Sequence, residues 1–147
     1  MTNGAPATVA EPLDTTESRD VEARLKERFP AAIVDVERAY GEVDFTVRAS
    51  DLLAVARFLR DEPGLEFIHL ADLTAVDRSA LPLRQRSRPG SEARFASIYH
   101  LYSIPHRRRI RLTAPAEGND DKPTVPSLYP LWKAAFCMER EAYDLVG

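Results

Sequence analysis

Cysteine and histidine, the residues most often used to bind metals or form cross-links, are scarce in this chain. Cys137 is the single cysteine among 147 residues, which excludes a disulfide within the chain and a zinc or iron–sulfur site built from several of its cysteines. His69, His100 and His106 are the three histidines, and none is spaced from another like a ligand pair. His69 and Asp72 have opposite parity, so in a strand they would point to opposite faces. The sequence therefore predicts structural or surface histidines and no metal centre.

Long apolar runs and the common nucleotide-binding or catalytic motifs are also missing. No apolar run approaches the ~20 residues of a membrane span, and the acidic N-terminus lacks the pattern of a secretory signal. There is no GxSxG, no P-loop and no strand–GxGxxG–helix unit. A net charge of −3 gives no overall preference for nucleic acid or anionic membranes. These absences predict a cytoplasmic protein with no NADH cradle and no active site on this chain.

The composition, 44% apolar and 29% charged, is that of an ordinary globular protein. Residues 1–17 are rich in Ala, Thr and Pro without an apolar period, which predicts a disordered leader, and residues 18–147 suit a single domain. Apolar residues in this domain recur with helical or strand spacing. The predicted elements are helices over 19–29 and 50–62, strands over 33–37, 43–47, 65–77, 92–103 and 106–113, and a final helix from 127.

The order helix, two strands, helix, three strands, helix (α-β-β-α-β-β-β-α) predicts the fold class. Strands that follow one another closely favour a mostly antiparallel or mixed sheet with helices on one face, which is a two-layer α+β sandwich. The stretch 65–77 is apolar on both parities, which predicts a central strand, and 92–103 is expected to be covered on both sides.

The predicted final helix begins at Ser127, whose hydroxyl can cap the first turn, and Pro130 falls where its missing N–H costs nothing. Between Phe136 and Met138, Cys137 is expected to be a small core residue rather than a nucleophile. The apolar stripe expected on this helix consists of Leu128, Leu131, Trp132, Ala135 and Phe136.

A basic row lies along the last predicted strand. Arg107, Arg109 and Arg111 alternate with other residues, so their guanidinium groups would lie on one face about 6.6 Å apart. Such a row suits bidentate bonds to carboxylates or phosphates. The alternatives are a solvated edge strand and, with Tyr99 and Tyr102, a surface that binds nucleic acid, although the acidic overall balance weakens the latter.

The C-terminus carries a dense charge cluster, Glu139-Arg140-Glu141 with Asp144. Arg140 and Asp144 are four apart in the order that is weaker for a helical pair, and exposed pairs contribute only about 0–1 kcal/mol. The stability of the isolated domain therefore explains this cluster poorly. A surface that meets complementary charges on a partner explains it better.

Four stretches together resemble one family. E-R-E-x-Y-D-L-x-G at Glu139–Gly147 is similar to the signature of the 30 kDa-type subunit of respiratory complex I, the NADH:quinone oxidoreductase. Leu70–Asp77, Tyr99–Leu112 and Val125–Leu128 fit the same family in the same order. Family members continue past the glycine into a basic, proline-rich tail, so the chain is expected to be a truncated or shortened member.

The resemblance implies a non-catalytic structural or assembly subunit of the hydrophilic arm, in a complex that transfers electrons from NADH to quinone and translocates protons. It implies no cofactor on this chain, since NADH, flavin, iron–sulfur clusters and quinone belong to other subunits. The implied partners are the quinone-site large subunit and the terminal-cluster subunit, on the cytoplasmic side of the plasma membrane, with membrane association only through the complex.

Two rival interpretations stay open: the equivalent subunit of a membrane-bound hydrogenase-type complex, and an autonomous nucleic-acid-binding module that uses the arginine row. With the resemblance, an acidic surface of a partner subunit becomes the preferred target of that row. The residues predicted at the partner interface are Arg107, Arg109, Arg111, Trp132, Glu139, Arg140, Glu141, Tyr143 and Asp144.

Overall fold

The computed structural model describes residues 16–39, 42–79, 89, 93–118 and 121–146. Most of the predicted leader, 1–15, lies outside the described residues, and its last two positions belong to the first helix. The elements are α1 (Thr16–Arg28), β1 (Ile33–Ala39), β2 (Glu42–Val47), a short 3-10 helix η2 (Ala49–Asp51), α2 (Leu52–Asp61), β3 (His69–Asp77), β4 (Phe95–Ser103), β5 (Arg108–Pro115) and α3 (Ala135–Val146).

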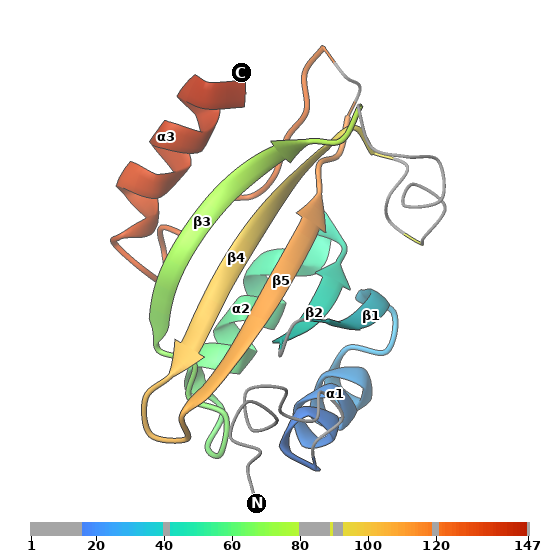
Figure 1. Cartoon of the computed structure of the whole chain (residues 1–147), viewed down its shortest axis with the longest axis vertical. Helices are drawn as coiled ribbons and strands as arrows, with labels where there is room; N and C mark the ends of the chain where they lie inside the picture. Colours follow the sequence, from blue (N-terminus) through green and yellow to red (C-terminus); the bar gives the residue numbers. More distant parts are fainter. Residues whose placement is uncertain (1–15, 40–41, 80–88, 90–92, 119–120, 147) are drawn as a thin grey trace, which may run out of the picture.

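The five strands form one mixed sheet in the order β1-β2-β5-β4-β3 (Figure 1). β2 and β5 pair in parallel, and the other three pairs are antiparallel. All three α-helices contribute to a single core cluster with the same face of the sheet. The predicted two-layer α+β fold, with helices on one face, is confirmed. None of the helices in the described part of the chain has the length and apolarity needed to cross a bilayer.

Local periodicity predicted the helix–sheet packing well. The apolar residues at helical spacing in the helix predicted over 50–62 are Leu52, Val55, Ala56 and Leu59, and all four are buried in α2. Val21 and Leu25 of α1 belong to the same core. The predicted stop after α2 is also confirmed, because Gly64 adopts φ +90°, a conformation that glycine takes without strain. The Arg24 guanidinium lies close to where a Cβ at Gly64 would stand and donates to the Pro63 carbonyl oxygen at 2.9 Å.

The expectation of a central strand over 65–77 is wrong. Leu65 and Phe67 are fully buried but lie in the connection before the strand, and β3 begins at His69 as an edge strand. A register shift between Leu70 and Asp72 marks a β-bulge, which moves the following side chains to the other parity. The bulge and the buried connection explain the apolar residues on both parities. β1, the other outer strand, carries a similar shift between Ile33 and Asp35.

The expectation that the strand over 92–103 is covered on both sides is also wrong. In β4 the buried residues of the core face, such as Tyr99, Leu101 and Ser103, alternate with half-buried ones. The reason is that the helices lie on only one side of the sheet. The other side of β4 belongs to an uncovered surface.

One ion pair links the end of β3 to the start of β4 and predicts a pH dependence. Arg94 donates two bonds of 2.9 Å to the Asp77 carboxylate, which also accepts the Ser79 backbone N–H at 3.0 Å. The bonds from Arg94, and then those from Ser79, hold the pKa of Asp77 well below its usual range.

We expect this pair to stabilise the fold above the ordinary aspartate pKa of about 3.9 and to lose its effect as the pH falls toward the depressed value. The effect is small because water reaches both side chains. Urea unfolding of the wild type and of Asp77→Asn between pH 7 and 2 measures it: the wild-type advantage should shrink below pH 4. A difference that is constant with pH would contradict the assignment.

Candidate functional site

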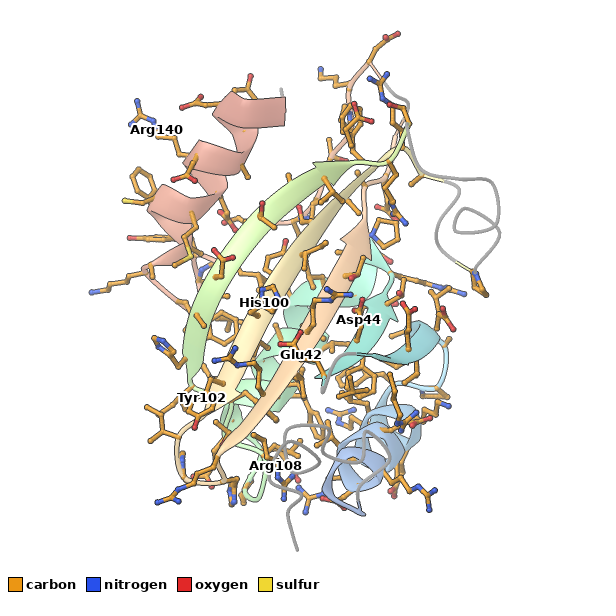
Figure 2. The ribbon with its side chains drawn as sticks, in the orientation of Figure 1. Glu42, Asp44, His100, Tyr102, Arg108 and Arg140 are labelled. Atoms are coloured by element: carbon orange, nitrogen blue, oxygen red, sulfur yellow. The ribbon has the colours of Figure 1, made fainter. Side chains whose placement is uncertain are left out.

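The face of the sheet opposite the helices is polar and forms the first candidate surface. Cross-strand register aligns Asp72, His100, Arg111 and Asp44 in one row across four strands. Figure 2 shows His100 and Asp44 on this face, with Tyr102 and Glu42 nearby. We call this surface the open sheet face and define it by Glu42, Asp44, His69, Asp72, His100, Tyr102, Arg109, Arg111 and Thr113.

The Asp44 carboxylate accepts hydrogen bonds from two other residues of the open sheet face. Its Oδ2 accepts Arg111 Nε at 3.1 Å and Nη2 at 2.9 Å, and its Oδ1 accepts the Thr113 hydroxyl at 2.9 Å. The carboxylate is only 12% exposed, so these bonds replace the water that it lost on folding. Arg111 is therefore committed to a carboxylate of its own chain.

The predicted row of three arginines is reduced to two. Arg107 precedes the strand, in a turn with φ +52°, and so does not alternate with Arg109 and Arg111. Arg109 lies across from Tyr102, with its guanidinium carbon 5.9 Å from the ring centroid. Because β5 is the middle strand of the sheet, the interpretation as an edge strand is wrong.

The β-bulge in β3 also changes the expected placement of His69 and Asp72. Their register partners, Tyr102 and His100, lie two apart on the same face of β4, so His69 and Asp72 share the open sheet face rather than opposite faces. His100 Nδ1 lies 3.9 Å from Asp72 Oδ2. The described residues contain no group of three or more His, Cys, Asp or Glu side chains that could hold a metal ion.

The helix predicted from Ser127 is in fact a turn followed by a separate helix. The N–H groups of Leu131 and Trp132 donate to the Leu128 carbonyl oxygen at 2.9 and 3.1 Å, and α3 begins only at Ala135. Two tertiary bonds hold the turn: Arg60 Nη1 donates to the Leu131 carbonyl oxygen at 2.9 Å, and Trp132 Nε1 to the Ile68 carbonyl oxygen at 2.9 Å.

Trp132 and Glu139, both predicted at the partner interface, make contacts within their own chain. Trp132 is buried. The Glu139 carboxylate accepts the Ser127 hydroxyl and the Leu128 backbone N–H, each at 2.7 Å. Ser127 in turn accepts the Tyr129 N–H at 3.1 Å. Sequence reasoning recognised Ser127 as a cap but missed Glu139 as its partner 12 residues away.

The outward surface of α3 is the second candidate surface. Arg140, Glu141, Tyr143 and Asp144 are exposed, as the predicted interface requires, and Figure 2 shows Arg140 pointing away from the sheet. Cys137 is exposed rather than a core residue, so that prediction is wrong.

Phe136, predicted in the apolar stripe, is also exposed, at 59%. Phe136 and Cys137 both point outward because the break after Trp132 shifts the phase of the helix that follows. α3 buries Ala135 and packs Met138 and Ala142 against the core.

A groove separates α3 from the sheet. Its lining includes Leu73, Tyr99, Val125, Glu139 and Tyr143. Burial raises the pKa of the Tyr99 phenol above its ordinary value, the hydrogen bond with Ser97 opposes that rise, and the negative charge of Glu139 adds to it. The phenol therefore stays protonated near neutral pH, and it lies in a groove that is mostly apolar.

The fold is shared with solved structures. The chain superimposes on a structure described as Nqo5 of the trypsin-resistant fragment (1-134) with a TM-score of 0.67 and 23% identity, covering 88% of this chain and 92% of that one. A second, described as the membrane-bound sulfane sulfur reductase, an archaeal respiratory membrane complex, gives a TM-score of 0.63 at 20% identity over 87% and 66% of the two chains. The chain thus has the same α+β fold as these two proteins.

Residues 45–147 match the family described as Respiratory-chain NADH dehydrogenase, 30 Kd subunit, and the chain belongs to this family. An NADH-quinone oxidoreductase subunit from Geotalea uraniireducens is 35% identical over 91% of this chain and 73% of its own length. Another, from Burkholderia cenocepacia, is 41% identical over 86% of this chain. The chain spans only 61% of that relative's length. The family confirms the resemblance seen in the sequence, and these names favour complex I over a hydrogenase-type complex.

Proposed function

We propose that the chain is a structural subunit of the hydrophilic arm of an NADH:quinone oxidoreductase, which transfers electrons from NADH to quinone and translocates protons. The observation that carries the proposal is the family match over residues 45–147, together with relatives that are named as subunits of NADH-quinone oxidoreductase. In this proposal NADH, flavin, iron–sulfur clusters and quinone bind to other subunits. The chain itself performs no chemistry.

The proposed partners are the quinone-site large subunit and the subunit with the terminal cluster, on the cytoplasmic side of the membrane. Arg107, Arg109, Arg140, Glu141, Tyr143 and Asp144 remain candidates for these contacts because all six are exposed. They fall on two surfaces, the sheet with its β4–β5 turn and the outside of α3, and β3 and β4 lie between β5 and the helix (Figure 1). The separation suits a protein that contacts more than one neighbour.

The open sheet face argues against the nucleic-acid-binding alternative. A phosphate backbone is held by basic side chains that are free to pair with it. Here Arg111 already pairs with Asp44, and Glu42 and Asp72 place further carboxylates on the same face. A phosphate chain crossing this surface would therefore meet negative charge in both β2 and β3.

The proposal predicts that the tagged full-length gene product, purified from solubilised membranes of its source cells, brings down identified complex I subunits. Mass spectrometry should find the quinone-site and terminal-cluster subunits, and cells with the untagged protein provide the background. Recovery with a nickel-site large subunit instead would move the assignment to a hydrogenase-type complex. Recovery of neither set would contradict the proposed function.

A further inference from the structure

The first residue of β5 holds a buried positive charge whose hydrogen bonds are incomplete. Arg108 lies across from Ser103 of β4, at the end of the sheet beside α1 (Figure 2). Its side chain is 18% exposed, and its Nε and Nη1 are buried without a hydrogen-bond partner among the described residues. The fully buried Ser103 hydroxyl has no partner there either. Since buried polar groups are almost always bonded, these two facing residues require an explanation.

Asp20 of α1 compensates the charge of Arg108 only in part. Its Oδ2 lies 4.0 Å from Arg108 Nη1, which is beyond hydrogen-bond distance. The same Oδ2 lies 3.6 Å from Arg24 Nε. One carboxylate therefore faces two guanidinium groups, which leaves one positive charge in excess.

Two further carboxylates in the neighbouring segments are already paired. Glu22 of α1 bonds to Lys26 and Arg38, and Glu66 bonds to His106 Nε2 at 2.9 Å. The excess positive charge beside Asp20 therefore remains. A buried water could bond to the free donors, but it would supply no charge, and burying a charge without a partner is costly. A bound anion supplies both the hydrogen bonds and the charge.

We propose that Arg108 and Ser103 bind a small free oxyanion of the inorganic phosphate class. Because Nη1 of Arg108 faces Asp20, the guanidinium edge formed by Nε and Nη2 is left for the ligand. Arg111 uses this same edge to bind Asp44, and the edge matches the geometry of oxyanions. The Ser103 hydroxyl donates a further bond. The inference goes beyond the proposed function and does not depend on it.

Burial favours a free ion over an acidic group of another protein. Ser103 is fully buried, and two of the three guanidinium nitrogens of Arg108 are buried as well, so the ligand has to lie below the surface. A carboxylate or phosphate of another folded chain would have to bring part of that chain into the same space. A small ion reaches the two residues through the exposed part of Arg108.

Isothermal titration calorimetry of the purified full-length chain with inorganic phosphate tests the site, at constant ionic strength set with sodium chloride. The wild type should bind one phosphate per chain. Arg108→Gln should weaken binding about tenfold or more, since hydrogen bonds to charged groups have effects of that size, and Arg108→Lys should weaken it because the fork is lost. Arg57→Gln is the matched control: it removes an exposed arginine of α2 and should keep wild-type affinity.

Ser103→Ala keeps the test valid if the Arg108 variants fail to fold. Its hydroxyl has no partner among the described residues, so the melting temperature without phosphate should not fall, while phosphate affinity should. Wild-type affinity in both Arg108→Gln and Ser103→Ala would overturn the site, as would the absence of binding to the wild type. Acetate that binds as tightly as phosphate would overturn the choice of a phosphate-type ion and indicate a carboxylate. Equal binding of chloride would overturn the oxyanion class.

Discussion

Replacing Trp132 with alanine is expected to lower the free energy of unfolding by about 3–5 kcal/mol, the usual cost of removing a large buried aromatic side chain. The indole is buried, and its N–H donates to the Ile68 carbonyl oxygen at 2.9 Å. The substitution would leave a cavity and an unsatisfied carbonyl group. Trp132 therefore joins the turn at 128–132 to the connection before β3.

Urea unfolding followed by circular dichroism measures this effect, since Trp132 is the only tryptophan and its fluorescence is lost in the variant. Trp132→Phe separates the two contributions: it keeps most of the apolar contact and loses about 1 kcal/mol with the hydrogen bond. Tyr129→Ala is a control in the same turn, with an exposed ring. Unchanged stability in Trp132→Ala, with loss of partner binding, would restore Trp132 to the interface.

The second large effect is expected for Glu139→Ala, which should cost about 2–3 kcal/mol, because hydrogen bonds to a charged group contribute about 1.5–3 kcal/mol each. The carboxylate accepts two short bonds, from the Ser127 hydroxyl and from the Leu128 N–H, both at 2.7 Å. Because Glu139 is partly exposed, we expect the two bonds together to contribute about 2–3 kcal/mol, near the lower end of what two such bonds can contribute. Without the carboxylate the Leu128 N–H loses its acceptor, and the turn is released from α3.

Glu141→Ala is the matched control, because Glu141 is an exposed carboxylate two positions along the same helix. Its removal should change stability by no more than about 0.5 kcal/mol. A double-mutant cycle of Glu139→Ala with Ser127→Ala isolates the bond between them, and an interaction energy near zero would show that the pair does not hold the segment.

The parts of the fold that depend on local spacing could be predicted from the sequence. The buried face of α2 follows from apolar residues at helical spacing, and Gly64 ends the helical segment for a backbone reason that the residue type reveals. The order of helices and strands then restricts the fold to a two-layer α+β arrangement. The family signature depends on residue identity alone, so it needed no knowledge of which side chains are buried.

The features that depend on distant contacts could not be predicted. Continuing one helical phase from Ser127 placed Phe136 and Cys137 inside, but the break after Trp132 is held by Arg60 and Ile68, more than 60 residues away. The hydrogen bonds that Glu139 accepts could not be predicted, because the groups that donate to it lie in another segment. Likewise, no sequence pattern predicted the β-bulge that brings Asp72 beside His100.

The two outer strands of the sheet are the ones with register shifts, between Ile33 and Asp35 in β1 and between Leu70 and Asp72 in β3. An outer strand presents free N–H and C=O groups that can template the addition of a foreign strand, and bulges and charged side chains interrupt that template. β1 adds several charged side chains to its bulge, and α3 lies along β3 (Figure 1). A newly made protein that waits for its complex is thereby protected at both margins against amyloid-like stacking with other copies, while the surfaces of its helix and sheet stay accessible for assembly.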